Sequence, residues 1–144
     1  MSGDACDKIE FVSPKVLKQP KLRVPAWISE LVSKISSDAR VPFLCPEVLV
    51  TRLECESTFG GRWFAHVNTI AVVIHPSRAV MRGVVVHEMG HWHRWAFGGD
   101  EPGEHDARFY TLMEKLYPRY DIGFDTARTI EHAPPAGWSR GKLW

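Results

Sequence analysis

The sequence predicts an α+β fold with an N-terminal helix, a three-stranded antiparallel sheet and two further helices, in that order. Three observations predict it. The chain has 144 residues, 44% of them hydrophobic and 24% charged, which is the balance of one ordinary globular domain. Apolar residues recur at helical spacing in three separate segments. Between the first and second of these segments, apolar and polar residues alternate as in half-buried strands.

The first helix is predicted between Pro25 and Arg40, because Pro25 suits a first helical turn. Its apolar residues recur at helical spacing and are Trp27, Ile28, Leu31, Val32 and Ile35. Residues 1–24 are expected to be an irregular lead-in, since Pro14 and Pro20 stand among scattered lysines.

Three strands are predicted over residues 48–56, 62–66 and 69–75. The first alternates, and the residues that share its apolar face are Leu49, Thr51, Leu53 and Cys55. Gly60-Gly61 indicates a turn before the second strand. Short links favour an antiparallel meander, with residues 69–75 as the exposed edge to which a peptide would add.

A long helix is predicted from Ser77, a suitable N-cap, to about Phe97, where two glycines stop it. After a polar loop, a further helix is predicted over residues 104–117. Beyond Ile122 the chain is expected to be irregular. The predicted organisation is therefore a lead-in over residues 1–24, a domain over 25–121 and a tail over 122–144.

Composition excludes several classes of protein. The chain has 18 Lys and Arg against 17 Asp and Glu, so nothing indicates a strongly basic surface for nucleic acid. The longest apolar runs, such as residues 70–74, are too short to span a bilayer, and the N-terminus lacks the layout of a signal peptide. Three cysteines without a CxxC pair predict a reducing, cytoplasmic setting.

The motif His87-Glu88-Met89-Gly90-His91 lies within the predicted long helix. Residues i and i+4 of a helix share one face, so His87 and His91 can direct their imidazoles at one metal ion. Glu88 lies beside that face and can act on a water molecule, as the HExxH pattern of zinc hydrolases requires. The surrounding residues place both histidines in or beside the buried stripe, where ring nitrogens without an ion would be poorly satisfied.

A catalytic zinc ion takes three protein ligands, and His105 is the candidate for the third. It shares an apolar stripe with Phe109, Leu112 and Leu116, and packing of that stripe on the long helix brings His105 to His87 and His91. Glu101 and Glu104 are alternative ligands, because some sites of this kind use a carboxylate.

Other side chains have weaker claims on the site. Asp100 or Asp106 could orient a ligand imidazole. His93 lies two positions beyond His91 and is expected to face away from the metal. The candidates for stabilising a reacting carbonyl oxygen are Tyr110, Tyr117, Tyr120 and Arg128. The tail that contains Trp138 either packs on the domain or stacks on single-stranded nucleic acid.

The stretch VVVHEMGHWHRWAFGGDEPGEHDARFYTLMEKLYP resembles the SprT-like metalloproteases, which include the Spartan protease, and the related Wss1 and WLM zincins. The resemblance covers roughly residues 77–120 and rests on HEMGH, the loop and the block His105-Asp106-Ala107-Arg108-Phe109-Tyr110. It implies a minimal zincin-like fold in which His105 is the third zinc ligand. Trp92 and His93 depart from the small residues common after the second histidine, and no cysteine-rich zinc ribbon follows.

The resemblance implies a zinc-dependent peptidase, in which water bound to a zinc ion held by three histidines is the nucleophile and Glu88 the general base. It also implies protein or peptide substrates, DNA-associated proteins among them, and a weak association with DNA. Two alternatives remain: a hydrolase of nucleotides or RNA that uses the same ion, and a non-catalytic binding module that the metal stabilises. A glutamate beside the first histidine favours peptide hydrolysis. The oligomeric state and the physiological substrate are not predicted.

Overall fold

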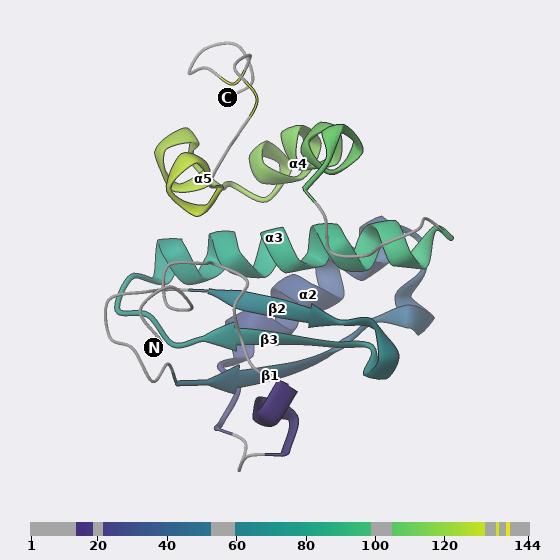
Figure 1. Cartoon of the computed structure of the whole chain (residues 1–144), viewed down its shortest axis with the longest axis vertical. Helices are drawn as coiled ribbons and strands as arrows, with labels where there is room; N and C mark the ends of the chain where they lie inside the picture. Colours follow the sequence, from purple (N-terminus) through teal and green to yellow (C-terminus); the bar gives the residue numbers. More distant parts are fainter. Residues whose placement is uncertain are drawn as a thin grey trace.

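The computed structural model describes most of the chain, and Figure 1 shows it. The described residues are 14–18, 22–52, 60–98, 105–131, Pro135 and Trp138. Within them the helices are the 3-10 helix η1 (Pro14–Lys18), α2 (Ala26–Asp38), the 3-10 helices η2 (Pro42–Leu44) and η3 (Ala65–Val67), α3 (Arg78–Ala96), α4 (Ala107–Arg119) and α5 (Phe124–Ile130). The strands are β1 (Glu47–Thr51), β2 (Gly61–Phe64) and β3 (Thr69–Val73).

The local signals for α3 act as the sequence predicted. The Ser77 hydroxyl accepts a hydrogen bond of 3.2 Å from the backbone N–H of Val80, so Ser77 caps the helix. At the other end Gly98 has a φ of +73°, a left-handed conformation that glycine adopts without strain. These two residues confine the helix to Arg78–Ala96.

The sheet is mixed, so the prediction of a fully antiparallel meander is wrong. The strand order is β1-β3-β2, in which β1 runs parallel to β3 and β2 runs antiparallel to it. The strand predicted over residues 69–75 is therefore the central strand, and it is not the exposed edge. Residues 53–56 of the first predicted strand lie outside the described residues.

The composition of β3 suits a strand that is buried on both faces of the sheet. All five residues of Thr69–Val73 are buried, and such a strand carries a continuous apolar run, whereas a strand with one solvated face alternates. Ile70 and Val72 belong to the main core, whereas Ala71 and Val73 pack with Val16 of η1 on the opposite face.

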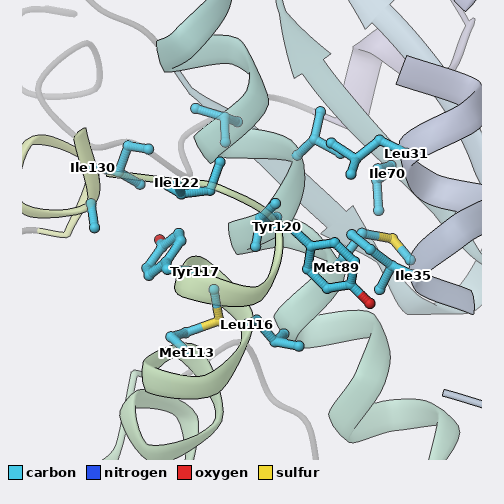
Figure 2. Close-up of a cluster of buried hydrophobic side chains, with 14 of the residues drawn as sticks. Leu31, Ile35, Ile70, Met89, Met113, Leu116, Tyr117, Tyr120, Ile122 and Ile130 are labelled. Atoms are coloured by element: carbon cyan, nitrogen blue, oxygen red, sulfur yellow. The ribbon is translucent and has the colours of Figure 1, made fainter. Parts of the chain in front are cut away.

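Helix α3 lies at the centre of the molecule. It contacts α2, β2 and β3 as well as α4 and α5, and Figure 1 shows α4 and α5 on the side of α3 away from the sheet. Figure 2 shows side chains from α2, β3, α3 and α4 meeting in the main core. The chain is thus layered as sheet, α3, then the pair α4 and α5.

The segment beyond residue 122 was expected to be irregular, and this is wrong for the part that forms α5. Ala127 and Ile130 of α5 are fully buried, and Ile122 just before it joins the same core. Trp138 is also buried: its indole N–H donates to Glu114 at 2.9 Å, so this side chain packs on the domain instead of offering a stacking surface. Among the described residues, no helix is both long and apolar enough to cross a membrane.

Candidate metal centre

Three imidazole rings meet where α4 approaches α3. His87 and His91 lie one turn apart on α3, and His105 stands just before the first turn of α4. One ring nitrogen from each lies within 4.8 Å of the other two, and His87 and His91 are buried. Within the described part of the chain, this is the group of side chains that could hold a metal ion.

The spacing of the rings fits a tetrahedral ion. The Nε2 atoms of His91 and His105 are 3.2 Å apart. A tetrahedral zinc ion binds imidazole nitrogens at about 2.0–2.1 Å, which places two such nitrogens roughly 3.3 Å apart. His91 and His105 therefore have the spacing of two such ligands, and His87 completes a group of three that could hold one metal ion.

The packing of α4 on α3 explains why His105 arrives there. The ring of Phe109 packs against His91 at 4.5 Å and against His105 at 4.7 Å between ring centroids, and the two imidazoles lie 5.2 Å from each other, so Phe109 supports both rings from one side. Gly90 makes this approach possible, because a Cβ atom at that position would lie 2.4 Å from Met113 Sδ and 3.2 Å from Phe109 Cε1. The glycine of HEMGH thus serves the contact between the helices.

Asp106 holds the start of α4 in place and does not reach the imidazoles. Its carboxylate accepts the backbone N–H of Phe109 at 2.9 Å and both terminal N–H groups of Arg94 at 3.1 and 3.2 Å. These bonds, led by that from Phe109, lower the pKa of Asp106. The suggestion that Asp106 orients a ligand imidazole is wrong, since it anchors α4 to α3. Asp100, Glu101 and Glu104 lie outside the described residues.

The residue that does orient a ligand imidazole is Glu131, immediately after α5. Its Oε2 lies 2.7 Å from Nδ1 of His87, and both side chains are fully buried. The hydroxyl of Tyr117 donates to the same Oε2 at 2.5 Å. Burial alone would raise the pKa of Glu131, but the charge of His87 and the hydrogen bonds from His87 and Tyr117 hold it below its ordinary value.

Sequence reasoning missed Glu131 because it lies 44 residues beyond His87, in a segment expected to be irregular. The available signal was weak. Ala127 and Ile130 precede it at helical spacing, which marks one turn of an amphipathic helix whose inner face would include position 131. Nothing in that spacing names His87 as the partner.

Glu88 is fully buried between α3 and the sheet. Its neighbour is β2: a Cβ atom built on Gly61 would lie 3.1 Å from Cγ of Glu88 and 2.8 Å from Cγ1 of Val84. Glu88 therefore packs against β2 at Gly61, one residue along α3 from the first imidazole.

The remaining candidates have other tasks. Tyr117 bonds Glu131, and Tyr120 donates to Asp38 at 2.8 Å, so neither hydroxyl is directed at a substrate carbonyl. Arg128 is exposed on α5 beside the ring of Phe124. Tyr110 lies with its ring edge toward His105, the centroids 6.2 Å apart.

His93 lies apart from the three-histidine group, as predicted from its position on the helix. Its half-buried ring packs against Phe97 at 4.6 Å between centroids. Burial lowers the pKa of His93.

Comparison with protein-family models, with curated proteins and with solved structures finds no significant match to this chain. The fold and the histidine group therefore carry the functional argument.

Proposed function

We propose that the protein is a zinc-dependent metallopeptidase in which His87, His91 and His105 hold the ion and Glu88 is the general base. The observation that carries the proposal is the convergence of the three imidazoles beside the glutamate of an HExxH helix. Three neutral nitrogen ligands leave one position of a tetrahedral zinc ion for water or substrate, as catalytic sites do and structural sites do not.

A zinc ion held there supplies Lewis-acid chemistry, because it polarises a carbonyl group and makes water easier to deprotonate. Glu88 accepts a proton from the attacking water and then delivers it to the leaving amine. His87 keeps its orientation through the hydrogen bond between Nδ1 and Glu131, which leaves Nε2 as the nitrogen that would bind an ion. The buried environment excludes bulk water and strengthens each of these electrostatic interactions.

The open side of β2 is the place where we propose that a peptide substrate binds. Among the described residues β2 pairs with β3 alone, so one side of its backbone has no strand partner. An extended peptide can add there as a further strand, with its backbone held by main-chain hydrogen bonds. Glu88 packs against Gly61 at the start of β2, which supports the proposal that a peptide on this edge would lie near the metal centre. DNA-associated proteins are the substrate class that the resemblance to SprT-like proteases favours.

Substitution of Glu88 by Gln tests the mechanism, because Gln keeps the shape of the side chain and cannot accept the proton. We expect Glu88→Gln to retain zinc and to lose at least about 100-fold of the cleavage rate, the usual contribution of a general base. The measurement pairs zinc content with cleavage of an unstructured protein such as casein, and of a basic DNA-binding protein with and without DNA.

Glu30→Gln is the matched control, since Glu30 is exposed on α2. It should leave both zinc content and cleavage unchanged. If Glu88→Gln cleaves as fast as the wild type, the proposed mechanism is wrong. If the zinc-loaded wild type cleaves neither protein, the histidine group has another purpose.

A further inference from the structure

Helix α5 ends at the metal centre. Glu131 follows its last residue, and its carboxylate contacts His87 in the middle of α3 although the two residues are 44 positions apart in sequence. The segment that carries Glu131 packs on the rest of the molecule through α5. The metal centre and the docking of α5 therefore depend on the same interactions.

We propose that metal binding and the docking of α5 on α3 form one coupled equilibrium, with Glu131 as the positioning residue that links them. The effect of Glu131 on metal affinity requires only that the histidine group binds a metal ion. The effect of Glu131 on cleavage rests on the proposed function. A change that moves α5 should therefore weaken the binding of zinc, although α5 supplies no ligand.

The hydrogen bond between Glu131 and His87 has a defined direction. Oε2 of Glu131 lies 2.7 Å from Nδ1 of His87 and accepts the hydroxyl of Tyr117, so the geometry assigns this oxygen as the acceptor and Nδ1 as the donor. The neutral ring then has its lone pair on Nε2, the nitrogen left for the ion. An imidazole in the other tautomer would present N–H to the ion and could not bind it.

A side chain of α4 holds the carboxylate of Glu131 in place. Tyr117 of α4 donates its hydroxyl to the same Oε2, and its ring packs against Trp138 at 6.0 Å between centroids. Figure 2 shows Tyr117, Ile122 and Ile130 in the region where α4 and α5 lie over α3. The carboxylate is thus aligned by a donor from α4, while α5 brings it to α3.

A contact at Gly83 lets α5 approach α3 closely. Gly83 lies one turn before His87, and a Cβ atom there would lie 2.2 Å from Cδ1 of Ile130 and 3.2 Å from Cγ2 of Thr126. Ile130 is fully buried and directly precedes Glu131. The absence of a side chain at position 83 therefore sets how closely the end of α5, and with it the carboxylate, reaches His87.

Glu131→Ala and Glu131→Gln test the positioning role in the full-length chain. Loss of a partner of this kind typically weakens metal binding by about 10–100-fold, and we expect that range for Glu131→Ala, measured by competition with a chromophoric zinc chelator. In Glu131→Gln the amide oxygen still accepts from Nδ1, so the loss should stay below about tenfold. The ¹⁵N NMR shifts of His87 in the metal-free protein should report a protonated Nδ1 in the wild type and in Glu131→Gln, and a mixture of tautomers in Glu131→Ala.

The two tyrosines of this region provide a matched pair of controls. Each is buried, and each donates its hydroxyl to a carboxylate, Tyr117 to Glu131 and Tyr120 to Asp38. Tyr117→Phe should weaken zinc binding, whereas Tyr120→Phe should leave it unchanged at a similar cost in stability. Equal zinc affinity in both variants would show that Glu131 needs no alignment from α4.

Gly83→Ala tests the docking of α5 without altering any group that contacts the ion. Alanine favours a helix interior more than glycine does, so α3 itself is not weakened. We expect zinc affinity to fall several-fold, and to recover in the double variant Gly83→Ala/Ile130→Val, which removes the Cδ1 atom that the new methyl group meets. A fall that Ile130→Val does not reverse would count against the coupling.

Coupling is reciprocal, so zinc should in turn hold α5 in place. The backbone N–H groups of Ala127 and Glu131, bonded to Gly123 and Ala127, should exchange with solvent more slowly when zinc is added, whereas those of α2 should not change. Zinc protection confined to α3 and α4 would overturn the inference. A chain that shows this coupling and cleaves no protein would refute the proposed peptidase and leave the coupling intact.

Discussion

Single side chains in this site are oriented by hydrogen bonds and ring contacts that come from other elements. Nδ1 of His87 faces Glu131, and the ring of Phe109 packs beside both His91 and His105. Because such partners already orient the ligand side chains, these side chains lose less conformational entropy when they bind the ion. The site is therefore organised before the metal binds.

Replacement of His105 tests whether it is the third ligand. Zinc sites in small domains bind with about 10–16 kcal/mol in total, so loss of one ligand should cost roughly 3 kcal/mol, or about 100-fold in affinity. We expect His105→Ala to lose its zinc on dialysis against a weak chelator, as metal analysis would show. His93→Ala is the control, because His93 is a half-buried histidine outside the group. Full zinc occupancy in His105→Ala would mean that another residue completes the site.

The hydrogen bond between Tyr120 and Asp38 makes stability depend on pH far from the metal centre. It lowers the pKa of Asp38 from its ordinary 3.8, with further help from Lys34 and Arg119. Burial, together with the bond to Asp38, raises the pKa of Tyr120 to about 12. Because its pKa is lowered in the folded state, the Asp38 carboxylate stabilises the fold above pH 3.8. This contribution is lost as the pH falls further. Because its pKa is raised in the folded state, the hydroxyl of Tyr120 stabilises the fold below pH 10.0. This contribution is lost as the pH rises toward 12.

Tyr120→Phe should therefore lower the free energy of unfolding by about 1–2 kcal/mol at neutral pH. The difference from wild type should shrink on both the acid and the alkaline side of that range. Urea denaturation of both proteins at three pH values measures it. A difference that stays constant across the range would show that the hydroxyl and Asp38 do not interact in the folded state.

Elements meet closely in this fold where α3 lacks side chains. Gly83 admits Ile130 of α5, and Gly90 admits Met113 and Phe109 of α4. Trp92, on another side of the same helix, is fully buried and donates its indole N–H to Leu44 of η2 at 2.8 Å. A helix with contacts on so many sides has no wide polar stripe, which fits the eleven buried residues of α3.

Gly90→Ala should disturb the contact between α3 and α4. The new methyl group would overlap Met113 and press on Phe109, and overpacking of this kind costs about 1–3 kcal/mol. We expect the midpoint of urea unfolding to fall and zinc affinity to fall with it, because Phe109 positions His105. Gly123→Ala is the control, since a Cβ there meets nothing within 4 Å, and its effect should stay below about 0.5 kcal/mol. Unchanged stability in Gly90→Ala would mean that α4 relaxes freely.

At the scale of the whole molecule, the metal centre joins elements that the chain order separates. The ligands come from α3 and the start of α4, while Glu131 follows α5. An ion bound there links these elements to one another, so zinc should stabilise the folded state as a whole.

Zinc at about 100 times its dissociation constant should add roughly 2.7 kcal/mol to the free energy of unfolding. For a domain of this size that corresponds to a rise of about 5–10 °C in the melting temperature, which a chelator should reverse. Thermal unfolding followed by circular dichroism measures the shift. The shift should vanish in His91→Ala, and the same rise in that variant would show that zinc binds elsewhere.

The sequence by itself determined the helices α2, α3 and α4, the three strands and the group of histidines, and it missed α5. Ser77 and the HExxH spacing act over a few residues, and local spacing is what a sequence displays directly. The stripe shared by His105 and Phe109 also predicted its packing on α3, because an apolar stripe must be buried against something.

The tertiary structure alone decided the order of the strands and the partner of His87. The apolar run of β3 was compatible with an edge or a central strand until β1 and β2 paired with its two sides. Glu131 was one acid among several until the packing of α5 on Gly83 placed it beside Nδ1 of His87. Contacts between segments that are distant in sequence depend on how whole elements pack. No local sequence pattern specifies these contacts.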